Sequence, residues 1–266
     1  MNTVAQVLPT MSADASHMPR SRVLRAYLEE ARAECLRYLR SPGFLIPTML
    51  LPTVFYLMFG IFLGRANGPD APRYLLAAYG TFGVMAPGLF GFGLALAMER
   101  DNGLLTLKRA LPMPPNAYLL GKMSMAMVVA ACVAILLLSM ATFLAHVPLT
   151  GAQMLALFFT DILGVLPFCA MGLWLGTLLK GQGAPSLVNL VYLPMSFLSG
   201  LWFPLNIMPR FIQEIAPIWP SYHLNRLALS AVGLGSTDGT LVRVIVLIGF
   251  TVAFVGLAAR RLRRHG

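Results

Sequence analysis

Six long runs of apolar residues dominate this chain, and the shorter segments between them carry nearly all of its charges. Each run is close to the roughly 20 residues that a helix needs to cross about 30 Å of hydrocarbon. The runs are continuous rather than alternating, which disfavours membrane strands. The pattern predicts an all-α integral membrane protein with six transmembrane helices in a membrane domain at 44–259. The predicted spans are 44–64, 74–98, 123–147, 154–179, 184–204 and 241–259.

Composition narrows the class of protein further. The 266 residues are 58% hydrophobic and 11% charged, whereas soluble domains carry about 25% charged residues. That composition leaves too little polar surface to cover a water-soluble globule, so soluble, disordered, fibrous and disulfide-scaffold proteins are disfavoured. The three cysteines form no CxxC pair and are interpreted as small packing residues. The bilayer is therefore the expected solvent.

The distribution of Lys and Arg predicts the orientation. Fifteen of them lie in 1–43, in 99–122, at Lys180 and in a basic tail at 260–266, against at most five on the opposite side. By the positive-inside rule, both termini are expected in the cytoplasm. The net charge of +10 also raises the question of nucleic acid. Cytoplasmic loops and anionic lipid headgroups explain it, so no nucleic-acid partner is expected.

The segment before the first span is predicted to have two parts. Residues 1–19 are expected to form a disordered tail. In 20–43, apolar residues recur at helical spacing with Arg and Glu on the other faces, which predicts an amphipathic helix on the cytoplasmic membrane surface. A soluble helix packed on another protein is the alternative. Because 1–43 has no apolar core of about 7–15 residues, it is not a signal peptide, and the first span is expected to be retained.

The cytoplasmic segment 99–122 is the most informative loop. Leu104, Leu107 and Leu111 fall on one stripe of a short helix, Lys108 stands near its end, and a proline run follows. A short helix with an apolar stripe and charged surroundings suits docking on a cytoplasmic partner. The alternative is a solvated connector between two spans.

The outer segment 205–240 is punctuated by prolines and contains short apolar stripes. It predicts one or two short helices that re-enter or cap the outer leaflet before the last span. Within the spans, Gly172 and Gly176 stand four residues apart, as Gly60 and Gly64 do, and this spacing permits close helix approach.

Several kinds of chemistry have no motif in the sequence. There is no GxxxxGK[ST] phosphate loop, no HExxH and no GxSxG, and the four histidines are scattered. We therefore expect no catalytic residue and no metal site, and energy for transport from another subunit. Asp161 is the one acidic residue inside a span, which is little for an ion relay. It is interpreted either as a polar point in a translocation path or as a paired or hydrated carboxylate.

Two motifs match a known family. Glu99-Arg100, then Gly103 and a leucine-rich stretch before Pro112, resembles the cytoplasmic segment of type-2 ABC exporter permeases. The sequence LSGLWFP at 198–204, followed by further prolines, resembles the outer signature of the same proteins. The chain thus resembles the membrane-spanning permease subunit of the bacterial drug-resistance and lipooligosaccharide exporter family. The resemblance covers about residues 20–262.

The resemblance implies partners and roles. It implies two cytoplasmic ABC ATPase subunits that hold ATP and Mg, a second permease copy or sister subunit, and a location in the bacterial inner membrane among its lipids. The chain itself is expected to bind no cofactor. The implied coupling residues are Glu99, Arg100, Gly103, Leu104, Leu107, Lys108 and Leu111. The implied interface-helix residues are Arg25, Tyr27, Leu28 and Arg32.

The expected function is export of an amphipathic drug, lipid or lipid-linked saccharide; an autonomous ion-coupled carrier is the alternative. Substrate is expected to follow the seam between two permease subunits. Polar or aromatic side chains on the predicted fifth span, together with the intramembrane carboxylate, are the candidate liners. They are Asp161, Asn189, Tyr192, Ser196 and Phe197.

Overall fold

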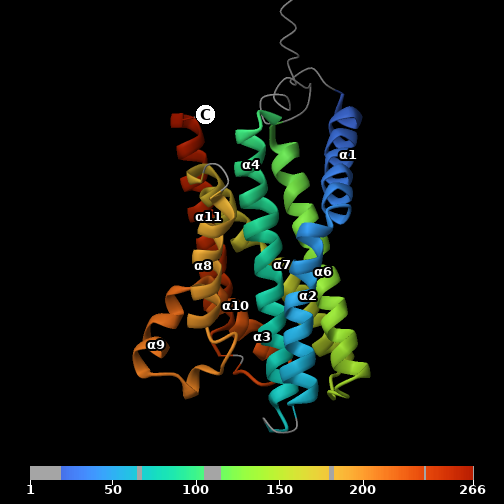
Figure 1. Cartoon of the computed structure of the whole chain (residues 1–266), viewed down its shortest axis with the longest axis vertical. Helices are drawn as coiled ribbons and strands as arrows, with labels where there is room; N and C mark the ends of the chain where they lie inside the picture. The colour runs from blue at the N-terminus through green and yellow to red at the C-terminus, as the bar shows by residue number, and fades with distance from the viewer. Residues whose placement is uncertain (1–18, 65–67, 105–114, 180–182, 237, 266) are drawn as a thin grey trace, which may run out of the picture.

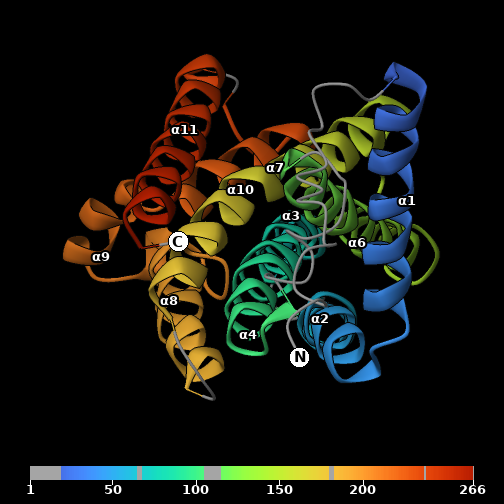
Figure 2. The same cartoon turned by 90° about the horizontal axis from the view of Figure 1, so that it is seen from above.

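The computed structural model describes residues 19–64, 68–104, 115–179, 183–236 and 238–265, and within these ranges every element is helical. Figures 1 and 2 show the bundle from the side and from above. The elements are α1 (Arg20–Leu39), α2 (Pro42–Phe55), η2 (Tyr56–Phe62), α3 (Ala71–Ala86), η3 (Pro87–Leu94), α4 (Ala95–Asp101), α6 (Pro115–Phe143), α7 (Gly151–Leu178), α8 (Ala184–Leu198), η4 (Leu205–Ile207), α9 (Arg210–Ile215), η5 (Ala216–Ile218), α10 (Pro220–Ala231) and α11 (Thr240–His265).

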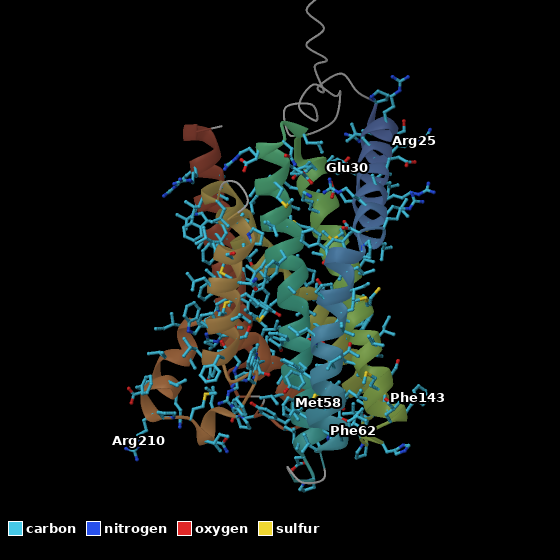
Figure 3. The ribbon with its side chains drawn as sticks, viewed as in Figure 1. Arg25, Glu30, Met58, Phe62, Phe143 and Arg210 are labelled. Atoms are coloured by element: carbon cyan, nitrogen blue, oxygen red, sulfur yellow. The ribbon has the colours of Figure 1, made fainter. Side chains whose placement is uncertain are left out.

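Five helical segments within the described residues are long and apolar enough to cross a membrane. They are Pro42–Phe62, Ala71–Asp101, Ala117–Phe143, Gly151–Leu178 and Thr240–Arg261. Five of the six predicted spans are therefore confirmed as long apolar helices. Large apolar side chains such as Met58, Phe62 and Phe143 are exposed on their outer surfaces, as Figure 3 shows. Such an exterior suits hydrocarbon rather than water.

The predicted span at 184–204 differs, because its helix α8 ends at Leu198. Gly200 adopts a φ of 77°, the left-handed region that glycine enters without a steric cost. The Gly200 N–H donates to the Phe197 carbonyl and the Leu201 N–H to the Ser196 carbonyl, the paired bonds of a Schellman cap. The 15 residues of α8 span only about 22 Å. The predicted span extends to residue 204, beyond the end of α8, because 199–204 remains apolar.

The continuous helix α3–η3–α4 forms the centre of the bundle (Figure 1). Its apolar window is 83% buried, against 11% for that of α11. Along η3 it meets α7 at a glycine seam, which we define as Gly88, Gly93, Gly172 and Gly176. A Cβ on Gly93 would lie 2.4 Å from the Gly172 carbonyl oxygen, and one on Gly176 would lie 2.6 Å from that of Gly93. The two backbones are therefore in direct contact.

The two ends of the bundle differ. At one end, called here the α1 end, lie α1, the end of α4 and the end of α11 (Figure 1). At the other, the α9 end, the chain between α8 and α11 folds into short helices, as predicted for 205–240. One of these, α10, packs against α3, α7 and α11. The helix expected over 20–43 is α1, which packs along α6; its position on a membrane surface stays a prediction.

Candidate functional site

A group of charged side chains lies buried between α1, α4 and α6 at the α1 end. Glu99 of α4 accepts hydrogen bonds from Lys122 Nζ at 2.9 Å, from Tyr118 Oη at 2.5 Å, and from the Arg37 guanidinium. Lys122 Nζ also donates to Glu34 at 3.2 Å, and Arg37 Nη2 donates to Glu34 at 2.8 Å. We call Glu34, Arg37, Glu99, Tyr118 and Lys122 the Glu99 cluster. Its two carboxylates and two cations balance one another.

Helical spacing places these side chains. Glu34 and Arg37 are three residues apart on α1, and Tyr118 and Lys122 are four apart on α6, so each pair shares a helix face. Gly121 admits α1 beside α6, because a Cβ there would lie 3.0 Å from Glu30 Cγ. Lys122 has no exposed surface and Glu99 has 7%. Buried charges are tolerated only when they are paired and hydrogen-bonded, and here each one is.

The environment also acts on the one cluster cation that reaches solvent. Burial by itself would lower the pKa of Arg37, but the carboxylates of Glu34 and Glu99 act more strongly together, and its pKa is raised above the ordinary value of 12.5. The guanidinium is therefore a permanent positive charge. Deprotonation of Arg37 therefore does not break its ion pairs with Glu34 and Glu99.

The next residue, Arg100, contacts a different pair of helices. Its Nη1 donates to the Thr177 carbonyl at 3.2 Å and its Nη2 to the Leu179 carbonyl at 2.8 Å. Arg261 of α11 donates from Nε to the same Thr177 carbonyl at 3.3 Å. These carbonyls end α7, where positive side chains complement the helix dipole. We call Arg100, Arg261 and the two carbonyls the Arg100 clamp.

The described part of the predicted coupling segment ends just beyond these contacts. Gly103 closes α4 at a φ of 71°, and Leu104 is 39% exposed. Of the predicted coupling residues, Glu99 and Arg100 are thus engaged inside the chain, whereas Gly103 and Leu104 face outward. The other three, Leu107, Lys108 and Leu111, lie outside the described residues.

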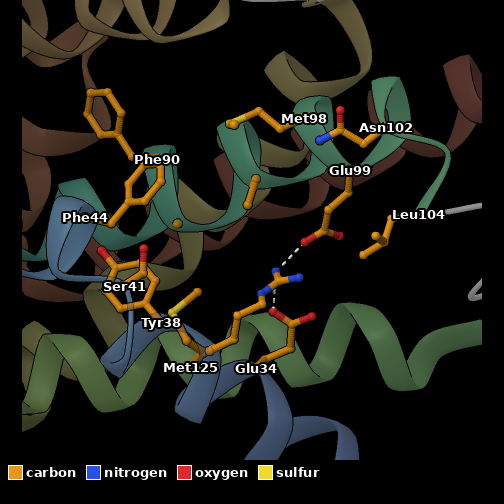
Figure 4. Close-up of a pocket in the computed structure, with 13 residues that line it drawn as sticks. Glu34, Tyr38, Ser41, Phe44, Phe90, Met98, Glu99, Asn102, Leu104 and Met125 are labelled. Carbon is orange, nitrogen blue, oxygen red and sulfur yellow. Dashed lines mark hydrogen bonds and ion pairs between the residues drawn. The ribbon is translucent and has the colours of Figure 1, made fainter.

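A pocket of about 380 Å³ lies beside the Glu99 cluster, between α1, the start of α2, η3–α4 and α6 (Figure 4). Phe44, Phe90 and Met125 line one part of it, and Arg37 and Glu99 line another. Sequence analysis missed this pocket and the partners of Glu99, since Lys122 was assigned to the end of a loop. A lysine one residue before an apolar run is a weak signal of burial.

The predicted interface-helix residues lie on α1 as follows. Arg25, Leu28 and Arg32 are exposed, and Tyr27 is half-buried. Figure 3 shows Arg25 near the N-terminal end of α1, away from α2. The exposed face combines leucine with arginine, so α1 keeps an amphipathic surface that α6 does not cover.

The predicted path residues do not share one surface. Asp161 is buried in α7 against Gly80 of α3, and its Oδ1 has no hydrogen-bond partner among the described residues. Tyr192 and Ser196 are buried in α8, where the Tyr192 hydroxyl donates to the Phe82 carbonyl at 3.2 Å. The other two, Asn189 and Phe197, are exposed on α8.

Around Tyr192 the structure adds an aromatic column that sequence analysis did not foresee. The ring centroids of Phe90 and Tyr192 lie 5.5 Å apart, those of Tyr192 and Phe82 5.0 Å, those of Phe82 and Phe55 6.2 Å, and those of Phe55 and Trp202 5.8 Å. These separations are typical of interacting aromatic pairs. The column leads from the pocket, which Phe90 lines, toward the α9 end.

Comparison with known proteins identifies the family. The model of the ABC-2 type transporter membrane family matches residues 28–232, which is more than half of the chain. This chain belongs to the ABC-2 type transporter permeases. The ABC-2 permease is a multi-pass membrane protein, the membrane subunit of an ABC transporter, and carries no ATPase site of its own. Partner subunits with ATPase activity are therefore implied.

Individual relatives agree with this assignment. The ABC-2 permease is similar to "Putative transport permease YvfS" of Bacillus subtilis, with 26% identity over 89% of this chain and 96% of that protein. It is 28% identical to "Probable multidrug ABC transporter permease YbhS" and to "Inner membrane transport permease YhhJ", both of Escherichia coli K12. Each of those matches covers 65% of this chain and 46% of the relative, so the chain spans about half the length of these two proteins.

Proposed function

We propose that this permease is the membrane subunit of an ATP-driven exporter, and that the end of α4 transmits the movement of its ATPase subunits to the bundle. In this proposal two cytoplasmic ATPase subunits hold ATP and Mg, and the permease pairs with a second copy or a sister subunit in the bacterial inner membrane. The cargo is an amphipathic drug, a lipid or a lipid-linked saccharide.

One observation carries the proposal. Two consecutive residues at the end of α4 bind different helices: Glu99 binds side chains of α1 and α6, and Arg100 binds the end of α7, which Arg261 of α11 also contacts. A displacement of this short helix end therefore acts directly on α1, α6 and α7, and through the end of α7 on α11. Packed helices respond to such a displacement by rigid-body shifts between discrete arrangements.

The segment that follows α4 supplies the docking surface. Leu104 is already exposed where the described part ends, and we assign the docking contact to it together with Leu107, Lys108 and Leu111. The exposed arginines and leucine of α1 lie at the same end of the bundle. We assign them a supporting contact with the membrane surface or with the ATPase.

We place the substrate route along the aromatic column and the exposed face of α8, where Asn189 and Phe197 would face the second permease subunit. Flat, apolar side chains suit an amphipathic cargo. The relative named a multidrug transporter permease supports a drug as one cargo class. Asp161 would be a polar point beside the route.

The test uses the permease co-expressed with its ATPase and reconstituted in proteoliposomes. Arg100→Ala removes the clamp without touching the docking surface. We expect it to co-purify with the ATPase but to lower cargo-stimulated ATP hydrolysis and export several-fold. Leu104→Asp should instead reduce co-purification. The matched control is Arg73→Ala, which removes an arginine-to-carbonyl contact with Pro148 at the α9 end, at 2.8 Å. Equal coupling in Arg100→Ala and wild type would contradict the proposal.

The alternative function, an autonomous ion-coupled carrier, has Asp161 as its one structural support. It requires gradient-driven cargo uptake by the purified permease without any ATPase. That result, if lost in Asp161→Asn, would replace the exporter proposal.

A further inference from the structure

The pocket beside the Glu99 cluster has an apolar part and a polar part. Aromatic and thioether side chains of Phe44, Phe90 and Met125 form the apolar part, with Ser41 beside Phe44, and the carboxylates of Glu34 and Glu99 lie at the other end (Figure 4). Phe44 is the third residue of α2, the start of the first apolar span. The pocket therefore begins beside the start of this apolar span and extends along the ends of α1 and α4.

The polar part keeps hydrogen-bond donors that no other described residue uses. Both oxygens of Glu99 are occupied, one by Tyr118 and the other by Lys122 and Arg37. Among the described residues the contacts of Arg37 use only Nη2, which leaves Nε and Nη1, and its side chain is 45% exposed. The Ser41 hydroxyl stands at the start of α2 without capping that helix. A ligand that accepts hydrogen bonds would engage these donors.

We propose that this pocket binds a glycerophospholipid of the inner leaflet. Phosphate oxygens would bind the free edge of the Arg37 guanidinium, and an acyl chain would lie over Phe44, Phe90 and Met125. Guanidinium groups bind phosphate through two parallel N–H bonds, which fits an arginine with two unused nitrogens. The volume of about 380 Å³ lies within the range of ligand pockets.

The site goes beyond the exporter proposal because it requires neither transport nor an ATPase. A bound lipid would fill the space between α1 and α4 and contact the helix end that carries the Glu99 cluster. Retaining the lipid at this place would keep α1 apposed to α4. The isolated permease is sufficient to test the inference.

The experiment uses the purified full-length permease in nanodiscs of phosphatidylcholine with trace amounts of a photoreactive lipid. One probe is phosphatidylglycerol with a diazirine on its acyl chain, and the other is diacylglycerol with the same chains but no phosphate. After irradiation, labelled peptides are mapped by mass spectrometry. We expect phosphatidylglycerol to label peptides containing Phe44, Phe90 or Met125, and diacylglycerol to label them roughly tenfold less, as loss of a charged hydrogen bond predicts.

Two variants separate binding from folding. Arg37→Lys keeps a cation near Glu34 and Glu99 but removes the spare guanidinium donors, and it should reduce pocket labelling roughly tenfold. Ala95→Phe fills the pocket from α4 without altering any charge and should abolish labelling there, so it decides the matter if Arg37→Lys is unstable. Their matched controls are Arg22→Lys on the exposed surface of α1 and Ala253→Phe on the exposed surface of α11, which should label as wild type.

Three results would overturn the proposal. The first is equal pocket labelling by the two lipids, which would leave only a hydrophobic contact. The second is undiminished labelling in Ala95→Phe. The third is displacement of phosphatidylglycerol from the pocket by inorganic phosphate at equal concentration, which would make free phosphate the ligand.

Discussion

The two sides of α4 hold their neighbours by physically different means. On the Glu99 side, two carboxylates and two cations pair in a region where Lys122 has no exposed surface. On the Arg100 side, a half-buried guanidinium meets neutral carbonyls at a helix end. A charge that loses its partner on the first side stays buried without its counter-charge, whereas a carbonyl that loses Arg100 is a neutral group, and that of Thr177 still accepts from Arg261. The first side should therefore fix the assembly of the helices, and the second can change during a cycle.

The largest effect should come from Lys122→Met. This change removes the buried cation that pairs with both Glu34 and Glu99, and Arg37 is then the one cation of the Glu99 cluster that contacts them. Removing one member of a buried ion pair typically costs about 3–5 kcal/mol. We expect a loss of this size in denaturant unfolding of the detergent-solubilised permease. Arg210→Met, on the exposed α9, is the control and should change stability by no more than about 0.5 kcal/mol. Equal stability of the two variants would refute a buried, paired Lys122.

Glu99→Gln should have a smaller effect, since the amide keeps the shape and can still accept a hydrogen bond. It leaves the two cations with Glu34 alone, and we expect a loss of about 2 kcal/mol. The double variant Glu99→Gln with Lys122→Met sharpens the comparison. It removes one charge of each sign, so its loss should fall short of the sum of the single losses by about 0.5–3 kcal/mol. Strict additivity would show that Glu99 and Lys122 do not interact.

Arg100→Ala should destabilise the permease less again, by about 1 kcal/mol, because its lost contacts are to neutral acceptors. Combining it with Arg261→Ala should cost more than the sum of the two single changes, since the Thr177 carbonyl then loses both of its arginine donors. Unfolding of the single and double variants measures this. A loss from Arg100→Ala as large as that from Lys122→Met would remove the distinction between the two sides of α4.

The smallest effect concerns His223 at the α9 end and extends the comparison to a titratable side chain outside both sides of α4. Burial lowers the pKa of His223 below its ordinary value of 6.5, with a further lowering from Arg243, although its bond to the Pro217 carbonyl acts in the opposite direction. The unfolded chain therefore takes up the proton first, and stability should decrease slightly as the pH falls from 7 to 5. Melting temperatures of wild type and His223→Gln check this. The variant should lose less over that interval, and identical pH profiles would exclude a role for this imidazole.

The long apolar helices were predictable because each is encoded locally. Runs of some 20 apolar residues need a spanning helix whatever their neighbours are, so five predicted spans match the structure closely. The spacing of Gly172 and Gly176 likewise predicted a close helix approach, and the glycine seam confirms it. The early end of α8 was missed because it depends on the backbone conformation of Gly200, and composition does not report that conformation.

The candidate site was predictable only in part, because it depends on distant pairings. Glu99 and Arg100 stood out by resemblance, yet their partners are separated from them by up to 79 positions, as in the contact of Arg100 with the Leu179 carbonyl. Nothing in the local sequence joins Glu34 of α1 to Lys122 of α6. Hydrophobic periodicity identifies which face of a helix is buried, but it does not identify which buried charges meet.

The glycine seam has a consequence for how the molecule could open. Where two backbones are in contact, no layer of side chains between them can slide or change rotamer. We therefore expect η3 and α7 to move as one rigid unit. Any widening of a passage must then come from helices that pack around this rigid unit, such as the sparsely covered α2 and α11. A cysteine cross-link between η3 and α7 should leave the transport cycle intact, whereas a cross-link between α2 and α3 should stop it.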